Sequence, residues 1–315
     1  MSLNWSTAKI LVTGGHGFLG SHLLESLRAK GCTKIFAPAR AECDLRDEPS
    51  VRTLFRSDYD LVFHLAASVG GIGANRAHPA DFFRDNMLMG IHTIDAATKA
   101  GVGRFVLLGT ICAYPKFAPV PFAESSLWDG YPEETNAPYG VAKRSLLVAA
   151  EGYRQQYGLR YTAIFPTNLY GPRDDFDLET SHVIPALIRK CEEARRRNEP
   201  TVQLWGTGDP SRDFLYVKDA VTGLLLAADC PEAEGQFFNL SLEREIKIRD
   251  LARVVADATG FKGTFAWDSS KPDGQPRRYV SSAAARKVLG FRTKYSLEDG
   301  IEETIRWYRD EFKSN

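Results

Sequence analysis

The segment KILVTGGHGFLGSHLLESLRAKG (9–31) decides the fold of this chain. Its first part, KILVTGG (9–15), is a short β-rich apolar run that ends at glycines. The part that follows has leucines at helical spacing and Gly31 as a stop signal: Leu19, Leu23, Leu24 and Leu27 share one face. A strand that passes through glycines into a helix predicts the start of a βαβ unit.

Three glycines at the junction of this strand and helix have the spacing GxxGxxG. Such a loop lets the backbone turn tightly and approach a pyrophosphate, while the N-terminus of the helix supplies amide donors and a favourable dipole. The pattern predicts a dinucleotide site, with contacts from Gly14, Gly17, Phe18, Leu19 and Gly20. The alternative is a glycine turn with a purely structural role.

Four further apolar runs indicate buried strands at 34–40, 60–67, 104–110 and 160–171, and helical patterns near 82–100 and 139–157 separate some of them. Strands that alternate with helices predict a parallel sheet covered on both faces. We therefore expect an α/β protein with a Rossmann-type, doubly wound parallel sheet.

After Gly171 the rhythm of the pattern changes. Helical patterns occur at 182–197, 220–229, 247–260 and 297–312, with a strand and a turn within 202–219. We expect a smaller, interleaved C-terminal α/β substrate domain. The predicted division assigns 1–171 plus about 213–240 to a Rossmann domain, and about 172–212 plus 241–315 to the substrate domain.

The composition excludes several functional classes. The 315 residues include 40 Lys and Arg and 40 Asp and Glu, so neither a nucleic-acid partner nor a polybasic membrane anchor is expected. Five cysteines with wide spacing and no CxxC argue against a disulfide framework or a metal site. They fit a reducing, cytoplasmic setting, as does an N-terminus without the apolar region of a signal peptide. No apolar run approaches transmembrane length.

The end of the second strand bears on which dinucleotide is bound. An NAD site usually has an acid there, which accepts from the ribose 2′-hydroxyl. This chain has FAPARAECDL (36–45), in which Arg40 is the nearest charge and Glu42 follows. A basic residue suits a 2′-phosphate, so NADP is favoured; a solvated Arg40 is the alternative. Asp44 and Leu45 are expected to cover the adenine, and Ala66 and Ala67 to pass beneath the cofactor.

A second group of residues suits proton transfer to a carbonyl oxygen. Tyr139 and Lys143 in YGVAK lie four residues apart and hence on one face of a helix, and Thr110 ends a neighbouring strand. A phenol has a reference pKa near 10, and a nearby lysine cation is expected to lower that pKa. Thr110 can hydrogen-bond the substrate oxygen while the phenol protonates it.

Together these features resemble the extended short-chain dehydrogenase/reductase superfamily and, within it, the GDP-L-fucose synthase family. The segments that carry the closer resemblance are spread over nearly the whole chain: VGGIGANR (69–76), CAYPK (112–116), PTNLYGP (166–172), SHVIPAL (181–187), RDFLYVKD (212–219) and KPDGQPRR (271–278). That family uses NADPH to convert GDP-4-keto-6-deoxy-D-mannose into GDP-L-fucose by 3,5-epimerisation and 4-keto reduction. The resemblance implies a GDP-sugar substrate and a homodimer.

Carried over by position, the resemblance assigns Thr110, Tyr139 and Lys143 to reduction, Cys112 as the base of epimerisation and His182 as its acid. It adds cofactor contacts by Lys143, Pro166, Asn168, Leu169 and His182. It also adds substrate contacts by Asn168, Lys190, Trp205, Arg212 and Arg277. The chain departs from the family at three positions: Thr110 and Ile111 stand where serines are usual, and Lys190 where arginine is expected.

The roles implied for Cys112 and His182 are chemically reasonable. Protons alpha to a ketone are acidic, and C3 and C5 of the sugar both flank the C4 ketone. Inversion needs a base on one face of the ring and a proton donor on the other, for which a thiol and an imidazole are suitable. Taken alone, a cysteine is more often a buried apolar residue and a histidine at a helix start is often a cap.

Two rival functions stay open. A related nucleotide-sugar enzyme could be a 4-ketoreductase or an epimerase that acts on another GDP-sugar, such as a heptose. A non-catalytic NADP-binding sensor would keep the glycine loop but tends to lose the tyrosine or the lysine, and this chain has both Tyr139 and Lys143.

Overall fold

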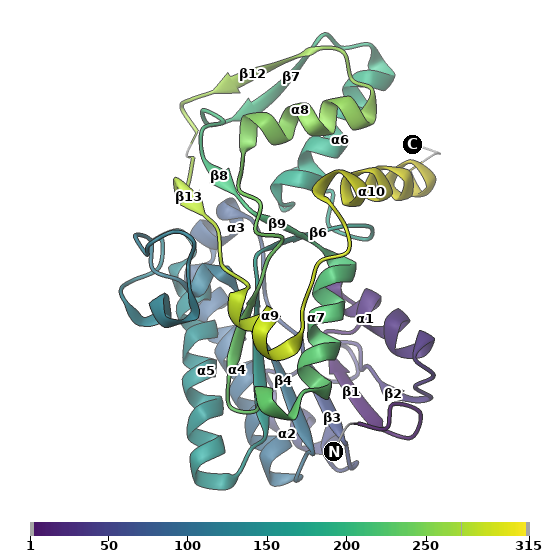
Figure 1. Ribbon diagram of the computed structural model, residues 1–315, viewed down its shortest axis with the longest axis vertical. Helices are drawn as coiled ribbons and strands as arrows, with labels where there is room; N and C mark the ends of the chain where they lie inside the picture. Colours follow the sequence, from purple (N-terminus) through teal and green to yellow (C-terminus); the bar gives the residue numbers. More distant parts are fainter. Residues whose placement is uncertain (1–2, 272, 313–315) are drawn as a thin grey trace.

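The computed structural model describes residues 3–271 and 273–312, so Pro272 of the 271–278 segment lies outside the described residues. Its centre is a six-stranded sheet in the order β10-β5-β4-β3-β1-β2, and every neighbouring pair is parallel (Figure 1). The strands are β1 (Lys9–Thr13), β2 (Lys34–Phe36), β3 (Leu61–His64), β4 (Arg104–Leu108), β5 (Tyr161–Pro166) and β10 (Phe237–Leu240).

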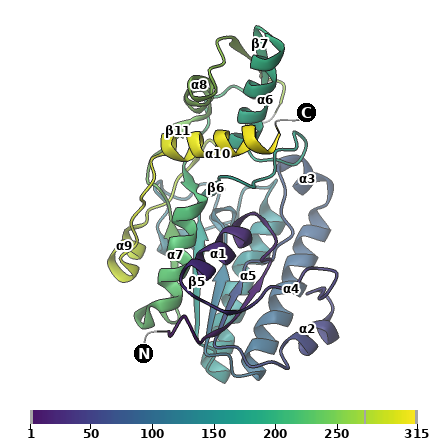
Figure 2. The same cartoon turned by 90° about the vertical axis from the view of Figure 1, so that its right-hand side faces the viewer.

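Helices cover both faces of this sheet, as Figures 1 and 2 show. Side chains alternate along each strand, so Ile10 and Phe63 enter one apolar cluster while Leu11 and Val62 enter the other. The first cluster includes α1 (Phe18–Ala29) and α7 (Val217–Asp229), and the second includes α2 (Glu48–Leu54), α4 (Pro79–Lys99) and α5 (Ala137–Tyr157). The predicted doubly wound α/β fold is confirmed.

Most of the remaining elements gather beyond the carboxyl ends of the sheet strands, whereas the helix Ala283–Leu289 lies beside α7 and β10 (Figure 1). Three small sheets are made by β7 (Thr201–Trp205) with β12 (Thr264–Asp268), by β6 (Asn168–Tyr170) with β9 (Phe214–Tyr216), and by β8 (Ser211–Arg212) between β11 (Ile246–Lys247) and β13 (Arg277–Arg278). The helices are α3 (Ile72–Ala77), α6 (Val183–Arg197), α8 (Ile248–Thr259), α9 (Ala283–Leu289) and α10 (Leu297–Glu311), and 3₁₀ turns span Ile111–Ala113, Glu124–Trp128 and Pro231–Ala233. Within 3–271 and 273–312, no helix has the length and apolar character needed to cross a bilayer.

Two differences from the predicted elements bear on the site. The run 160–171 is not one strand, because β5 ends at Pro166 and β6 leaves the large sheet to pair with β9. Thr167 lies at the break, where its hydroxyl donates to the Asp213 carbonyl at 2.9 Å. In addition, β10 is a strand that the pattern did not predict, and it completes the sheet beside β5.

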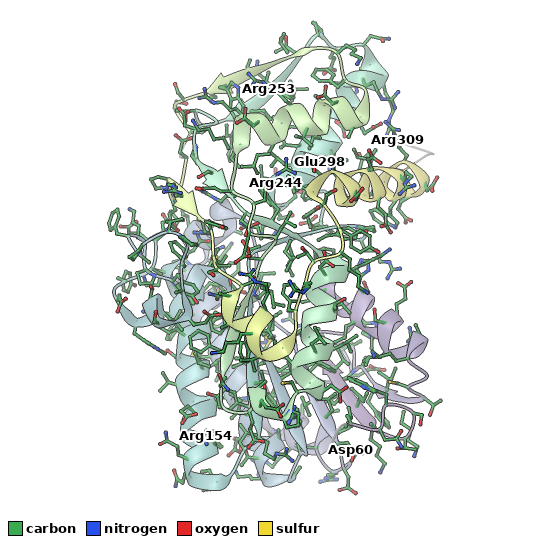
Figure 3. All side chains as sticks on the ribbon, viewed as in Figure 1. Asp60, Arg154, Arg244, Arg253, Glu298 and Arg309 are labelled. Carbon is green, nitrogen blue, oxygen red and sulfur yellow. The ribbon has the colours of Figure 1, made fainter. Side chains whose placement is uncertain are left out.

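One buried carboxylate ties α6, α8 and α10 together. The Glu192 side chain is fully buried, and its Oε1 accepts from Arg309 Nη2 at 2.6 Å and from Nε at 3.0 Å. Arg309 Nη2 also donates to the Thr259 carbonyl at 2.8 Å, and Arg195 donates to Glu192 Oε2 at 2.8 Å. Figure 3 shows Arg309 on α10, and Arg253 on α8, where it pairs with Asp250 at 3.3 Å in an exposed position.

Arg309→Ala should lower the free energy of unfolding by about 2 kcal/mol, because it leaves a buried carboxylate with a single guanidinium partner. Urea denaturation measures this loss. Arg253→Ala is the matched control and should cost less than about 0.5 kcal/mol, since its ion pair is exposed. Equal effects of the two substitutions would contradict the importance given to Glu192.

Candidate active site

A cavity of about 1160 Å³ lies at the carboxyl ends of the sheet strands. Its volume exceeds the range of roughly 300–1,000 Å³ that is usual for a pocket holding one small ligand. Its wall combines the loops after β1, β3 and β4 with residues of α6, β8 and β13. The cavity therefore has room for two ligands side by side.

The glycine loop forms one end of this cavity. Gly14 has φ +71°, and a Cβ placed on it would lie 2.7 Å from the Ala66 nitrogen. A Cβ on Gly20 would lie 2.1 Å from the Gly14 carbonyl oxygen, so α1 packs directly on the loop. Gly17 precedes the first turn of α1 and provides no side-chain cap for its amides. At Gly14 and Gly20 there is no room for a side chain, and the first amides of α1 have no side-chain cap. Such a loop can bind the pyrophosphate of a dinucleotide, because the backbone can approach it and the free amides can donate to it.

Every residue predicted to contact the cofactor except Lys143 lines this cavity: Gly14, Gly17, Phe18, Leu19, Gly20, Arg40, Asp44, Leu45, Ala66, Ala67, Pro166, Asn168, Leu169 and His182. The Arg40 side chain is 75% exposed, with its Nε 3.9 Å from Asp44 Oδ2. Hydrogen bonds from Arg46 lower the pKa of Asp44 to about 2. Arg40 therefore stands at the cavity edge with its guanidinium accessible, as binding of a phosphate group requires.

The three residues predicted for reduction come from adjoining elements. Thr110 follows β4, and its Oγ1 accepts from the Cys112 amide at 3.2 Å, which caps the 3₁₀ turn. Tyr139 lies in α5 and, like Thr110, lines the cavity. Lys143 lies one turn later, is 1% exposed and donates to the Leu108 carbonyl at 3.0 Å. Lys143 thus stands behind the cavity wall.

Burial controls the proton affinities of this group. It raises the pKa of the Tyr139 phenol well above its usual value, and the hydrogen bond with Thr110 opposes that rise only weakly. Burial also lowers the pKa of Lys143 to about 8. The expected lowering of the phenol pKa is therefore wrong for this structure: desolvation and the nearby Cys112 raise that pKa, and Lys143 is not among the groups that shift it. A phenol that keeps its proton at neutral pH suits a proton donor.

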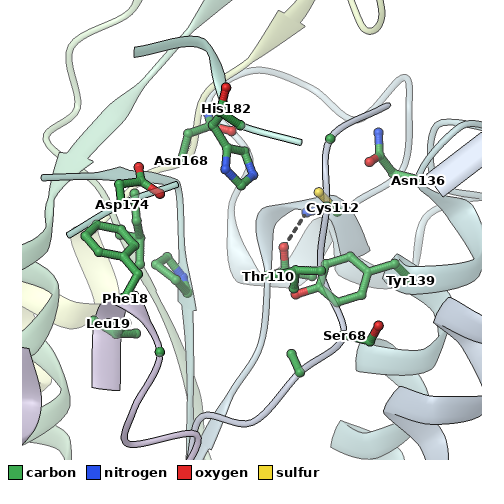
Figure 4. A pocket seen from close by; sticks show the side chains of 18 of the residues that line it. Phe18, Leu19, Ser68, Thr110, Cys112, Asn136, Tyr139, Asn168, Asp174 and His182 are labelled. Atoms are coloured by element: carbon green, nitrogen blue, oxygen red, sulfur yellow. Dashed lines mark hydrogen bonds between the residues drawn. The ribbon is translucent and has the colours of Figure 1, made fainter. Parts of the chain in front are cut away.

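Cys112 and His182 reach the cavity from separate elements. Cys112 is half-buried in the 3₁₀ turn, and α5 packs tightly against that turn, since a Cβ on Gly140 would lie 2.2 Å from the Cys112 carbonyl oxygen. His182 is the residue before α6, and Figure 4 shows its ring facing the space that Cys112, Thr110 and Tyr139 border. Desolvation by the surrounding walls lowers the pKa of His182, and Asp175 partly opposes this.

Four of the five residues predicted for substrate contact line the cavity: Asn168, Lys190, Trp205 and Arg212. Lys190 Nζ donates to the Gln203 carbonyl at 2.9 Å, and Trp205 is 63% exposed. The structure does not bring Arg277 to this cavity. Its side chain is 57% exposed, pairs with Glu245 at 2.6 Å and lies at a separate hollow of about 550 Å³.

Arg278, the next residue, lines the cavity in place of Arg277. Arg278 is 8% exposed and lines the cavity, because successive side chains of β13 point to opposite sides. The signal was present in the sequence, since GQPRR offers two adjacent arginines, but a two-residue strand has no pattern that distinguishes them.

Sequence reasoning also missed Asp174. It lines the cavity, its Oδ2 is buried with no hydrogen-bond partner among the described residues, and burial raises its pKa to about 7. Its only sequence signal is its position directly after the YGPR turn. Across the described part of the chain, no group of three or more His, Cys, Asp or Glu side chains is arranged to hold a metal ion.

The chain belongs to the NAD dependent epimerase/dehydratase family, whose model matches residues 10–241. Among curated relatives, it is 40% identical over 302 residues to the probable GDP-L-fucose synthase 1 of Oryza sativa subsp. japonica, with 95% of this chain and 92% of the relative covered. The predicted resemblance to GDP-L-fucose synthases is therefore confirmed.

Solved structures extend the comparison. A GDP-L-fucose synthetase from Naegleria fowleri bound to NADP has a TM-score of 0.89 and 29% identity, covering 100% of this chain and 96% of that chain. A GDP-6-OMe-4-keto-L-xylo-heptose reductase from C. jejuni has a TM-score of 0.91 and 25% identity, covering 99% of this chain and 100% of that chain.

Gly20→Ala should weaken dinucleotide binding about tenfold or more, because the added methyl group forces α1 away from the glycine loop. Quenching of protein fluorescence on titration with the dinucleotide measures the affinity. Gly152→Ala is the control, since it lies in α5 with no heavy atom within 4 Å of the added Cβ, and it should bind like the parent. Unchanged affinity of Gly20→Ala would refute the close packing described for this loop.

Proposed function

We propose that this protein converts GDP-4-keto-6-deoxy-D-mannose into GDP-L-fucose by NADPH-dependent 3,5-epimerisation and 4-keto reduction. The observation that carries the proposal is a single cavity in which a thiol, an imidazole and a threonine–tyrosine pair border the same space next to the glycine loop. The relatives named GDP-L-fucose synthase and the NADP-bound neighbour support the substrate and the cofactor.

Epimerisation starts with the Cys112 thiolate, which removes the proton from C3 or C5 of the sugar. A thiol S–H bond forms, and the electron pair of the C–H bond becomes part of an enolate whose charge lies on the C4 oxygen. Tyr139, which keeps its proton because its pKa is raised, donates a hydrogen bond to that oxygen. His182 then delivers a proton to the opposite face of the carbon, which inverts the centre.

Reduction uses the same activated carbonyl. Bound NADPH supplies the hydride for C4. Tyr139 gives its proton to the C4 oxygen, and the Thr110 hydroxyl orients that oxygen. Lys143 stands one turn behind the phenol and holds the Leu108 carbonyl, so it fixes the backbone where β4 ends. Threonine in place of serine keeps the required hydroxyl, while Ile111, 3% exposed, adds an apolar wall to the same cavity.

The two ligands divide the cavity between them. We assign NADP to 1–171 plus about 213–240, with the pyrophosphate at Gly17–Gly20 and the 2′-phosphate at Arg40. The nucleotide sugar takes 172–212 plus 241–315. There the cavity wall supplies the Arg212 and Arg278 guanidiniums for a diphosphate and the exposed face of Trp205 for a base.

One alternative has a specific observation in its favour. The similarity to a heptose 4-keto reductase supports a GDP-sugar 4-ketoreductase without epimerisation. Such an enzyme needs Thr110, Tyr139 and Lys143. It does not require the Cys112 thiol and the His182 imidazole, which border the same space. The presence of both in the cavity favours the epimerase–reductase, and the retention of both Tyr139 and Lys143 disfavours a non-catalytic sensor.

Incubation with GDP-4-keto-6-deoxy-D-mannose and NADPH, followed by NMR of the product, tests the function. Tyr139→Phe should slow reduction about 100-fold or more and slow deuterium entry at C3 and C5 to a smaller extent, because Cys112 and His182 remain but the hydrogen bond to the C4 oxygen is lost. Cys112→Ser should show the reverse loss, with deuterium entry slowed and NADPH binding retained. Deuterium entry at the parent rate in Cys112→Ser would remove the cysteine from the mechanism, and reduction without inversion would favour the ketoreductase.

We further infer a homodimer in a reducing, cytoplasmic setting. The five cysteines are all free, which supports that setting. Large apolar side chains are exposed on the adjoining helices α4 and α5: Phe83, Val148 and Tyr157.

Light scattering after size exclusion should give twice the mass of one chain, and Val148→Asp should reduce the measured mass to that of a single chain. Phe117→Asp changes a still more exposed side chain outside these helices, at 85% against 57% for Val148, and should leave the dimer intact; a monomeric parent overturns the inference.

A further inference from the structure

Two arginines face the cavity from paired strands at the level of Cys112. Arg278 of β13 and Arg212 of β8 are register partners, and both line the cavity. Arg278 Nη1 lies 3.5 Å from Cys112 Sγ, and its Nε donates to Gln275 Oε1 at 3.0 Å. Gln275 in turn donates to the Lys116 carbonyl at 2.8 Å. The guanidinium is therefore held from behind while one of its N–H groups points at the sulfur.

The charge of Arg278 has no carboxylate partner among the ion pairs of the described residues. Glu133 feels its charge, because the Arg278 guanidinium contributes to lowering the pKa of Glu133. However, Oε2 of Glu133 accepts hydrogen bonds from Thr135 at 2.5 Å and from Asn136 at 3.0 Å. The Arg278 guanidinium is 8% exposed, donates to a neutral amide and a thiol, and is balanced by Glu133 only through space, without an ion pair.

The other titratable groups around the sulfur lie on separate elements. Tyr139 of α5 keeps its proton, because burial raises its pKa and proximity to Cys112 raises it further. Arg212 of β8 adds positive charge; burial, and after it the charge of Arg278, lower its pKa to about 9. His182 faces the same space from the start of α6, with its pKa lowered by desolvation. The carboxylates of Glu133 and Asp273 line the same cavity and act on Arg212 through space, so the charge in direct contact with the sulfur is that of Arg278.

We propose that Arg278 is a positioning residue that holds the Cys112 sulfur and stabilises it as a thiolate. A guanidinium stays charged across the working pH range, and a hydrogen bond to the ionised form of a group favours that form. The thiolate is the species that can accept a proton from carbon. What the thiolate acts on rests on the proposed function, whereas the state of the sulfur is a property of the protein alone.

Arg277 offers a matched control. It is the neighbouring residue of the same type, yet its side chain is 57% exposed and forms an ion pair with Glu245 at 2.6 Å. Removing either arginine changes the net charge of the protein equally. Only Arg278 touches the sulfur, so an effect through direct contact separates the two variants and an effect through overall charge does not.

The experiment measures how fast iodoacetamide alkylates Cys112 as a function of pH, with the modified peptide identified by mass spectrometry. In Arg278→Gln the pH of half-maximal alkylation should rise by about one unit, because a neighbouring positive charge shifts a titration by about that much. Arg278→Lys, which keeps the charge, should restore at least half of this shift. Arg277→Gln should alkylate like the parent.

The sugar substrate then links the sulfur to turnover. In Arg278→Gln, entry of deuterium from the solvent at C3 and C5 should slow tenfold or more near neutral pH and recover as the pH rises. Unchanged alkylation profiles in both Arg278 variants, or equal shifts in Arg278→Gln and Arg277→Gln, overturn the proposal. A raised KM for the sugar nucleotide with an unchanged alkylation profile also overturns it, because Arg278 then serves the diphosphate only. A shifted profile without turnover of this sugar upholds the proposal and rejects the function.

Discussion

The direction of the sheet strands is the constraint on which the rest of the molecule depends. Because β1, β3, β4 and β5 are parallel, their carboxyl ends meet at one edge of the sheet. The residues that follow these strands, among them Gly14, Ala66, Thr110 and Asn168, therefore border one cavity although they are far apart in sequence. Antiparallel pairing of any one strand would carry its loop to the other end of the sheet.

Desolvation, more than pairing of charges, sets the chemistry at this edge. It keeps the phenol of Tyr139 protonated and brings the pKa of Lys143 down to about 8, although the two lie one helical turn apart. It also lowers the pKa of His182 at the facing wall. A phenol that holds its proton can donate a hydrogen bond, and an imidazolium with a lowered pKa is a stronger acid but is less populated at neutral pH.

The sequence allowed local features to be predicted and left out those that depend on distant partners. The helix 18–29 and the strands 9–13, 61–64 and 104–108 follow from apolar spacing and glycine punctuation, which are local signals. The cavity-lining glycines and Thr110 follow from motifs at the ends of those strands, Tyr139 follows from the YGVAK spacing in a helix, and Cys112 follows from the family resemblance. In contrast, β10 is four residues long, and it is a strand only because β5 offers it an edge.

Distance in the chain also explains why Arg277 was predicted to contact the substrate when Arg278 lines the cavity. Which of Arg277 and Arg278 turns inward is decided by the pairing of β13 with β8, and no local pattern encodes that register. The expected effect of Lys143 on Tyr139 failed for a related reason, since a motif gives the spacing of two side chains but not the burial around them. Asp174 escaped notice because a carboxylate after a turn is usually solvated.

The place of β10 has a consequence for synthesis of the protein on the ribosome. Phe237 of β10 pairs with Ala163 of β5, so the edge of β5 stays bare until the intervening residues have emerged. During that interval the nascent chain exposes unpaired amide and carbonyl groups of β5, a strand that is fully buried in the folded protein. Such an open edge can pair with other chains. A stop codon before residue 240 would make that transient state permanent, so shortened products of this gene should accumulate as aggregates or be degraded.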